Sequence, residues 1–151
     1  MPKQTIRVEG LSELKDALEE LPKATGTNVL KRALTQAADP IQAQAESLAP
    51  VMTGKLKRSI IVGTKLSSTQ KKSAKKINKV EIYVGPGQLR QATLQEFGTV
   101  NQRPQPFLRP AWSANVRPAL DSIRELLADE IEKARARIAR KIARLAALNS
   151  K

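Results

Sequence analysis

Residues 96–112 read EFGTVNQRPQPFLRPAW, and this stretch decides how the late part of the fold is built. It contains both phenylalanines, the only tryptophan and three of the nine prolines, in a chain that is only 3% aromatic. Each proline fixes its own φ and pushes the residue before it towards an extended conformation. We therefore expect a stiff segment over residues 99–110, which we call the strap. It could be a catalytic loop, a nucleic-acid stacking platform or a docking surface, and the rest of the sequence is needed to choose between them.

Within this strap, Phe107 and Leu108 lie between Pro106 and Pro110. Neighbouring side chains of an extended backbone point to opposite faces, so one is expected to anchor to the core while the other faces outward. A segment that is ordered before it binds gains affinity, which favours docking. In the alternative arrangement, both side chains tuck beneath the C-terminal helix.

The charge balance predicts an anionic neighbour. Lys and Arg number 27 against 14 Asp and Glu, a net charge of +13, which fits nucleic acid, membrane headgroups or an acidic protein surface. The chain has no Cys and no His, so it lacks thiol chemistry, the commonest general base and the commonest metal ligand. No signal peptide or apolar membrane span is visible. We expect a soluble cytoplasmic product with no cofactor, no metal and no enzymatic activity.

The spacing of apolar residues predicts a single α+β domain. Helical patterns cover residues 11–21, 27–49 with a kink at Pro40, 88–99 and 111–151, while strand patterns cover 5–10, 58–66 and 79–86. We expect a small, mostly antiparallel sheet packed against two or three helices, followed by a long C-terminal helix. Residues 1–115 then form the α+β unit, and residues 116–151 form a basic amphipathic helix.

That last helix is too long for a small domain to cover. Its apolar positions recur every three or four residues; they are Leu120, Ile123, Leu127, Ile131, Ala134, Ile138, Ile142 and Leu145. A helix of about 35 residues is ~50 Å long at ~1.5 Å per residue. Part of this stripe must therefore meet another chain or another element.

Two basic runs are candidates for contact with an anionic partner. The first lies in residues 65–79, which we expect to form a mobile hairpin tip because residues 67–79 contain five lysines and little to bury. The candidate contacts are Lys71, Lys72, Lys75 and Lys76 there, and Arg137, Arg140, Lys141 and Arg144 on the last helix. Neither run has interleaved aromatics for base stacking. A solvated face, or contact with an acidic protein, is favoured over sequence-specific binding of nucleic acid.

Glu96 is the one acid flanked by apolar and turn residues. An acid–base role would need a second carboxylate in a matching context, and the sequence offers none. We expect a structural role instead, in which Glu96 accepts hydrogen bonds from backbone amides of its own turn. Gly98 is expected to adopt a positive φ in that turn.

Several short motifs, taken in order, resemble one known family. EFGT followed by RPQPFLRPAW is similar to the closing motif of the head–tail joining, or tail-completion, proteins of tailed bacteriophages, whose relatives include the lambdoid minor tail protein Z. Upstream, VEGLSELKDALEEL resembles the family's opening helix, APVMTGKLKRSI its Ala-Pro-x-x-Thr-Gly-x-Leu turn, and VEIYVGP the strand before the closing motif. The resemblance covers roughly residues 6 to 115.

This resemblance implies a non-enzymatic virion protein of the phage neck. It would form a homo-oligomeric ring, a hexamer, around the DNA channel and would join the tail end to the head connector after assembly in the host cytoplasm. The implied motif positions are Pro50, Thr53, Gly54 and Leu56 in the first turn, and Glu96, Phe97, Gly98, Thr99, Pro106, Phe107, Leu108, Pro110 and Ala111 in the second. The resemblance brings no catalytic residues. The alternative function is a basic, non-specific DNA-binding protein.

Overall fold

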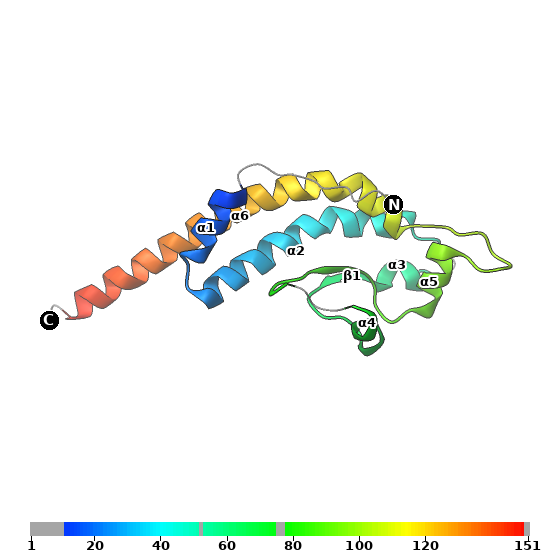
Figure 1. Cartoon of the computed structure of the whole chain (residues 1–151), viewed down its shortest axis with the longest axis horizontal. Helices are drawn as coiled ribbons and strands as arrows, with labels where there is room; N and C mark the ends of the chain where they lie inside the picture. The colour runs from blue at the N-terminus through cyan, green and yellow to red at the C-terminus, as the bar shows by residue number, and fades with distance from the viewer. Residues whose placement is uncertain (1–10, 52, 75–77, 150–151) are drawn as a thin grey trace.

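The computed structural model describes residues 11–51, 53–74 and 78–149 (Figure 1). The elements in chain order are α1 (Leu11–Glu19), α2 (Lys23–Leu48), α3 (Lys55–Ser59), β1 (Ile60–Gly63), α4 (Ser68–Ser73), β2 (Tyr83–Pro86), α5 (Arg90–Phe97) and α6 (Leu108–Asn149). The predicted α+β class with a long C-terminal helix is confirmed. The strand expected over residues 5–10 lies outside the described residues.

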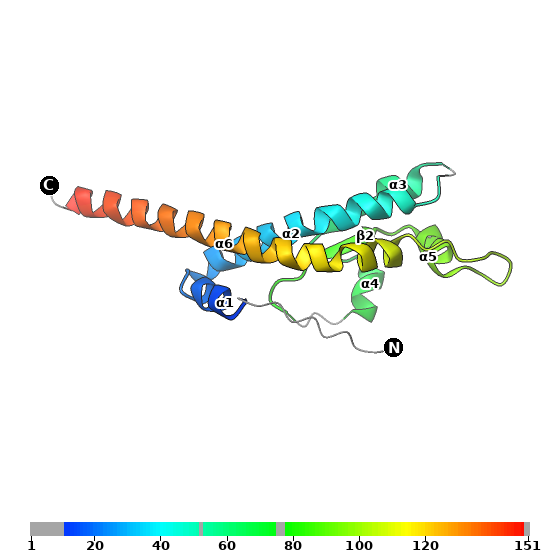
Figure 2. The same cartoon turned by 90° about the horizontal axis from the view of Figure 1, so that it is seen from above.

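Helices α2 and α6 run side by side and form the spine of the molecule (Figures 1 and 2). The face of α2 that is buried consists mainly of small side chains, among them Ala33 and Ala37. Small residues let two helices approach closely, so their backbones can pack along most of α2. Towards the start of α2, Val29 and Ala33 share a core cluster with Leu127 and Ile131 of α6.

Helix α2 is a single helix with Pro40 inside it, as predicted, and its C-cap is Ala49, directly before Pro50. It begins at Lys23, one turn earlier than expected. Thr27 does not cap the helix from outside, because its hydroxyl donates to the carbonyl of Lys23 at 2.9 Å within the helix.

The sheet consists of two antiparallel strands, with Ile60 paired with Pro86 and Gly63 paired with Tyr83. Both strands are shorter than the patterns predicted. Residues 58 and 59, which were expected to begin the first strand, instead end the helix α3. Leu56 and Ile60 are both buried in the same cluster, and the helical turn between them brings both side chains inward.

The lysine-rich connection between the strands contains a helix that the sequence pattern did not predict. Ser67 caps α4: its hydroxyl accepts from the amide of Gln70, and the side chain of Gln70 accepts from the amide of Ser67. Such a reciprocal capping box satisfies two amides that a helix start leaves unpaired. Lys71 and Lys72 lie in the last turn of α4, where the helix dipole favours positive charge.

Helix α6 begins at Leu108, three residues before the expected start. The prediction that Phe107 and Leu108 are extended neighbours with opposite orientations is therefore wrong. Phe107 is fully buried, and Leu108 is half-buried against the same core cluster. Pro110 fits the first turn of the helix, where a missing amide costs no intrahelical hydrogen bond.

Candidate functional site

The two motif segments meet at one end of the molecule, around Phe107. Leu56 from the first motif and Phe107 from the second lie in one buried cluster, together with Ala45 of α2, its C-cap residue Ala49, and Ala111 of α6. Phe107 is among the largest fully buried side chains of the described residues. The strap is thus anchored to the core beneath the start of α6.

Glu96 locks α5 to the start of α6. One carboxylate oxygen accepts from the amides of Phe107 at 2.8 Å and Leu108 at 3.0 Å. The other accepts from the amide of Arg109 at 3.1 Å and from its Nε at 2.9 Å. The predicted role of Glu96 as an acceptor for backbone amides is confirmed, but the predicted location of those amides is wrong. They belong to the start of α6, 11 to 13 residues further along the chain, and not to the turn that follows Glu96.

This arrangement stabilises the ionised carboxylate. Burial alone would raise the pKa of Glu96, but the hydrogen bonds from the amides of Phe107, Leu108 and Arg109, and from the Arg109 side chain, outweigh it and lower the pKa below its ordinary value of 4.5. A negative charge at a helix N-terminus is also favoured by the helix dipole. Glu96 is therefore a charged structural cap, and both of its carboxylate oxygens accept hydrogen bonds from the start of α6.

Arg109 is the partner of Glu96 that the sequence analysis did not single out. Its Nη2 also donates to the carbonyl of Glu96 at 2.8 Å, and its guanidinium lies 5.0 Å from the centre of the Phe97 ring. An acid between apolar residues, such as Glu96, indicates that a basic side chain should lie beside it. However, Arg103 and Arg109 both follow it in the strap, and the sequence alone does not choose between them.

Gly98 makes the sharp turn between α5 and the strap, with φ 75° and ψ −177°. The predicted positive φ is confirmed. This conformation is accessible to glycine almost exclusively. A Cβ at Gly98 would lie 2.7 Å from the carbonyl oxygen of Gln102 and 2.8 Å from the nitrogen of Pro104. Thr99 and Gln102 then pair as an isolated β-bridge, so the strap returns as a tight hairpin.

The first motif forms a second turn that faces the strap. Gly54 adopts a left-handed conformation with φ 67° and precedes α3. The guanidinium of Arg58 donates to the carbonyl of Thr53 at 3.4 Å, closing the turn. Pro50 ends the long helix α2 just before it.

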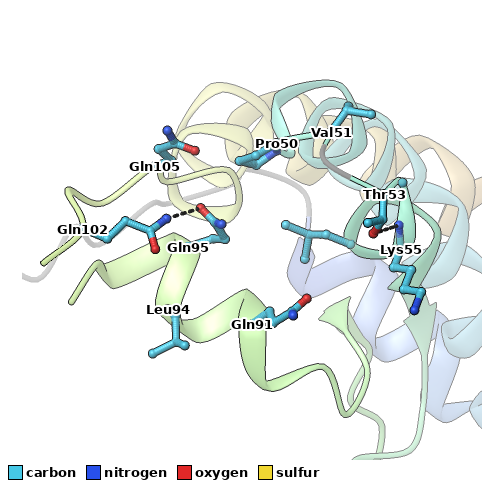
Figure 3. A pocket seen from close by; sticks show the side chains of 11 residues that line it. Pro50, Val51, Thr53, Lys55, Gln91, Leu94, Gln95, Gln102 and Gln105 are labelled. Atoms are coloured by element: carbon cyan, nitrogen blue, oxygen red, sulfur yellow. Dashed lines mark hydrogen bonds between the residues drawn. The ribbon is translucent and has the colours of Figure 1, made fainter.

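A groove of about 680 Å³ lies between these two turns (Figure 3). We call it the glutamine groove. Its lining residues are Pro50, Val51, Thr53, Gly54, Lys55 and Leu56 on one side, and Gln91, Leu94, Gln95, Gln102 and Gln105 on the other. The side-chain amide of Gln102 donates to the side-chain oxygen of Gln95 at 3.2 Å, and the backbone N–H of Gln105 donates to the backbone carbonyl of Gln95. The glutamines thus help to hold the strap beside α5.

The chemistry of this groove suits uncharged polypeptide. It is lined by apolar surface and side-chain amides, with one lysine and no carboxylate. Amides offer both donors and acceptors and so match a peptide backbone. Among the described residues, no group of three or more Asp or Glu side chains is arranged to hold a metal ion. The sequence analysis missed these four glutamines, although Gln91 and Gln95 are four residues apart and so share one face of α5.

Exposed apolar side chains gather at the same end of the molecule. Val51 is 72% exposed, Phe97 64% and Val100, in the hairpin of the strap, fully exposed. The other large apolar side chains exposed at this end are Leu48, Leu94 and Trp112. Large exposed apolar patches on soluble proteins usually mark interaction sites.

The predicted basic residues do not form one surface. Lys71 and Lys72 are exposed on α4, whereas Arg137, Arg140, Lys141 and Arg144 are exposed near the end of α6. These two elements lie far apart in both views (Figures 1 and 2). Lys75 and Lys76 lie outside the described residues.

This end of the molecule thus combines a carboxylate-capped helix start, a tight glycine turn and the glutamine groove. A comparison with known families gives an independent finding. The family model HK97-gp10_like, described as "Bacteriophage HK97-gp10, putative tail-component", matches residues 12–98, more than half of the chain. The chain belongs to the HK97-gp10-like family. No curated protein and no solved structure matches it significantly.

Membership of the HK97-gp10-like family indicates a structural role as a component of the phage tail, and hence a place in the virion. The matched region contains α1 to α5 and ends at Gly98, so it includes the first motif turn, Glu96 and one wall of the glutamine groove. Within the part of the chain that the structure describes, no helix is both long and apolar enough to span a bilayer.

Proposed function

We propose that this protein completes the tail end of a phage and joins it to the head connector, as a ring of identical subunits around the DNA channel. The observation that carries the proposal, beyond family membership, is the rigid end built around Glu96 and Phe107, which presents the glutamine groove and exposed apolar side chains. Six copies would form the ring, and the flanking partners would be the other structural proteins of the neck.

Rigidity at this end has a direct use in a ring. Subunits of a closed ring must meet at one fixed angle, and a strap held by a buried phenylalanine and a buried carboxylate defines an angle better than a flexible loop. The neutral groove would receive an uncharged segment of a neighbouring virion protein. This function needs no catalysis: the chain would act through assembly alone.

A non-specific DNA-binding function has weaker support. The candidate basic residues that the structure describes lie on α4 and near the end of α6, which are far apart, so they do not together form one track along a DNA backbone. The net charge of +13 is compatible with incidental contact between ring subunits and packaged DNA.

Localisation in assembled particles tests the proposal. An epitope tag on this protein is expected to label one end of the tail, at the junction with the head, in negative-stain electron micrographs of intact phage. Labels along the whole tail tube, or particles that contain no copies of the protein, would contradict a role at the neck. A parallel gel-shift assay with random DNA checks the alternative function: tight binding at physiological salt would favour DNA binding.

A further inference from the structure

The last three turns of α6 project beyond the body of the protein (Figures 1 and 2). Ile138 is the last residue of α6 that packs against the core cluster shared with α1 and α2. The 11 residues from Ala139 to Asn149 extend the helix by about 16 Å at ~1.5 Å per residue. We call this segment the projecting end.

One face of the projecting end is apolar. Ile142 is 62% exposed, Leu145 is 52% exposed and Leu148 is 66% exposed. These residues recur every three positions after Ile142 and continue the apolar stripe that packs against α1 and α2 further back along α6. A solvated helix end does not need three large apolar side chains on one face, so this face is suited to a protein partner.

Positive charge flanks this apolar face. Arg140, Lys141 and Arg144 are exposed beside it, and no acid follows Glu132 in the sequence. Among the described residues, Lys141 and Arg144 form no ion pair. Contact with DNA phosphates would use the charges but leave the apolar residues in water. The partner should therefore be a protein surface that is both acidic and partly apolar.

The same chain has such a surface between α2 and α6. A groove of about 580 Å³ is lined by Gln36, Asp39, Ser122, Glu125, Leu126 and Asp129. We call it the acidic groove. It contains three carboxylates, no base and a half-buried leucine. Asp129 is paired with Lys133, whereas neither Asp39 nor Glu125 forms an ion pair with any other described residue.

Two comparisons favour this groove over other places on the molecule. The glutamine groove has one lysine and no acid, and the groove beside α1 has two lysines against one glutamate, so neither attracts a basic helix. At the end of α1, Glu19 pairs with Lys15, and the next residue, Glu20, pairs with Arg135 of α6. Of these three grooves, the acidic groove therefore offers the best charge match to a basic helix.

A subunit cannot fill its own acidic groove. Glu125 and Lys141 belong to the same continuous helix, 16 residues apart, which separates them by about 24 Å along its axis. A straight helix cannot fold back over that distance. The projecting end of one subunit can meet the acidic groove only of another subunit.

We propose that the projecting end of α6 docks into the acidic groove of a second copy of this chain. The contact joins two different surfaces of the protein, so it is head-to-tail, and repetition of such a contact closes a ring when the rotation between subunits permits it. This inference rests on the proposed function and specifies how the ring subunits would hold one another.

Charge reversal on the full-length protein tests this docking. One variant, R140E/K141E/R144E, reverses the projecting end, and a second, D39K/E125K, reverses the acidic groove. The control K65E/K71E/K72E also reverses three exposed bases, but in and beside α4. All proteins are treated with nuclease, checked for folding by circular dichroism, and analysed by sedimentation velocity across a range of concentrations.

The wild-type protein and the control should self-associate, and each of the two test variants alone should associate about ten-fold or more weakly, since several exposed charge pairs become repulsive. An equimolar mixture of the two test variants should recover association, because the reversed end of one matches the reversed groove of the other. This recovery is not expected from misfolded proteins.

Three results would overturn the docking proposal: wild-type protein that is monomeric at its highest soluble concentration, test variants that associate like the control, or a mixture that does not recover. Complexes that disappear with nuclease treatment would also overturn it, because they are held by nucleic acid. None of these results contradicts the proposed role of the protein at the neck. Absence of the protein from tail ends in labelled particles would do that, so the two proposals fail separately.

Discussion

The carboxylate of Glu96 accepts a hydrogen bond from the backbone amide of Phe107 at 2.8 Å. This bond connects the end of α5 to the buried residue that anchors the strap in the core. The most buried described charge and the largest fully buried side chain thus belong to one connection. Both sides of that connection border the surface that we propose for assembly. Its stability can be measured on the isolated protein, independently of any partner.

Replacing Glu96 with Gln should lower the free energy of unfolding by about 2–4 kcal/mol at neutral pH, because hydrogen bonds to a charged group are lost and an amide NH₂ faces the Arg109 donors. The pKa of Glu96 is lowered in the folded state, so its contribution is complete above pH 4.5 and is lost as pH falls through the folded pKa. The difference between wild type and E96Q, measured by urea unfolding, should therefore shrink at acidic pH. The exposed Glu132→Gln is the control, and an equal loss in both variants would contradict the cap.

Replacing Phe107 with Ala should lower the free energy of unfolding by about 3–5 kcal/mol, since it empties a fully buried position. The other phenylalanine supplies a matched control. Phe97 is 64% exposed, so Phe97→Ala should cost no more than about 1 kcal/mol, mainly from its contact with Arg109. Similar losses for the two variants, measured in the same chemical unfolding series, would show that Phe107 is not the anchor.

Replacing Gly98 with Ala should destabilise the protein by about 2 kcal/mol or more, because the backbone at this position is accessible almost exclusively to glycine. The added Cβ would also meet the strap backbone at 2.7 Å. Gly87→Ala is the control: nothing lies within 4 Å of a Cβ there, and its φ is not positive. Thermal unfolding of the pair should show a lowered midpoint for G98A alone, and an unchanged midpoint for G98A would contradict the turn.

A charge placed in the glutamine groove should impair assembly without affecting folding. Val51 is 72% exposed and lines the groove, so Val51→Glu leaves the core intact while adding a carboxylate to a surface that has none. The exposed Ile61, on β1 and outside the groove, gives the control Ile61→Glu. We expect equal unfolding midpoints for both variants, but fewer joined particles with V51E only. Equal yields of joined particles with the two variants would show that the glutamine groove is not part of the assembly surface.

How far the fold could be predicted from sequence depends on the range of the interactions. Helices α2 and α6 were predictable because their apolar residues recur over many turns, and Pro50 marks where α2 ends. Helix α4 was missed because its lysines suggested disorder, while its stability comes from a local capping box between Ser67 and Gln70. Ser67 and Gln70 have the three-residue spacing of a capping box, but the high lysine content of the segment led to a prediction of disorder.

The candidate site was predictable in its residues but not in its contacts. The glycine turn at Gly98 follows from local chain geometry, and its positive φ was expected. The partners of Glu96 were not, because α5 and the start of α6 approach each other only through the strap, which separates Glu96 from Arg109 by 13 residues. Nothing in the local sequence fixes where a hairpin of this kind returns.

Complementation of a phage that lacks this gene product is the measurement that tests the account most directly. Without the protein, electron microscopy should show DNA-filled heads and separate tails, and wild-type protein supplied from a plasmid should restore joined, infectious particles while V51E should not. Joined particles and normal infectivity in the absence of the protein would contradict the central claim that it completes the tail and connects it to the head.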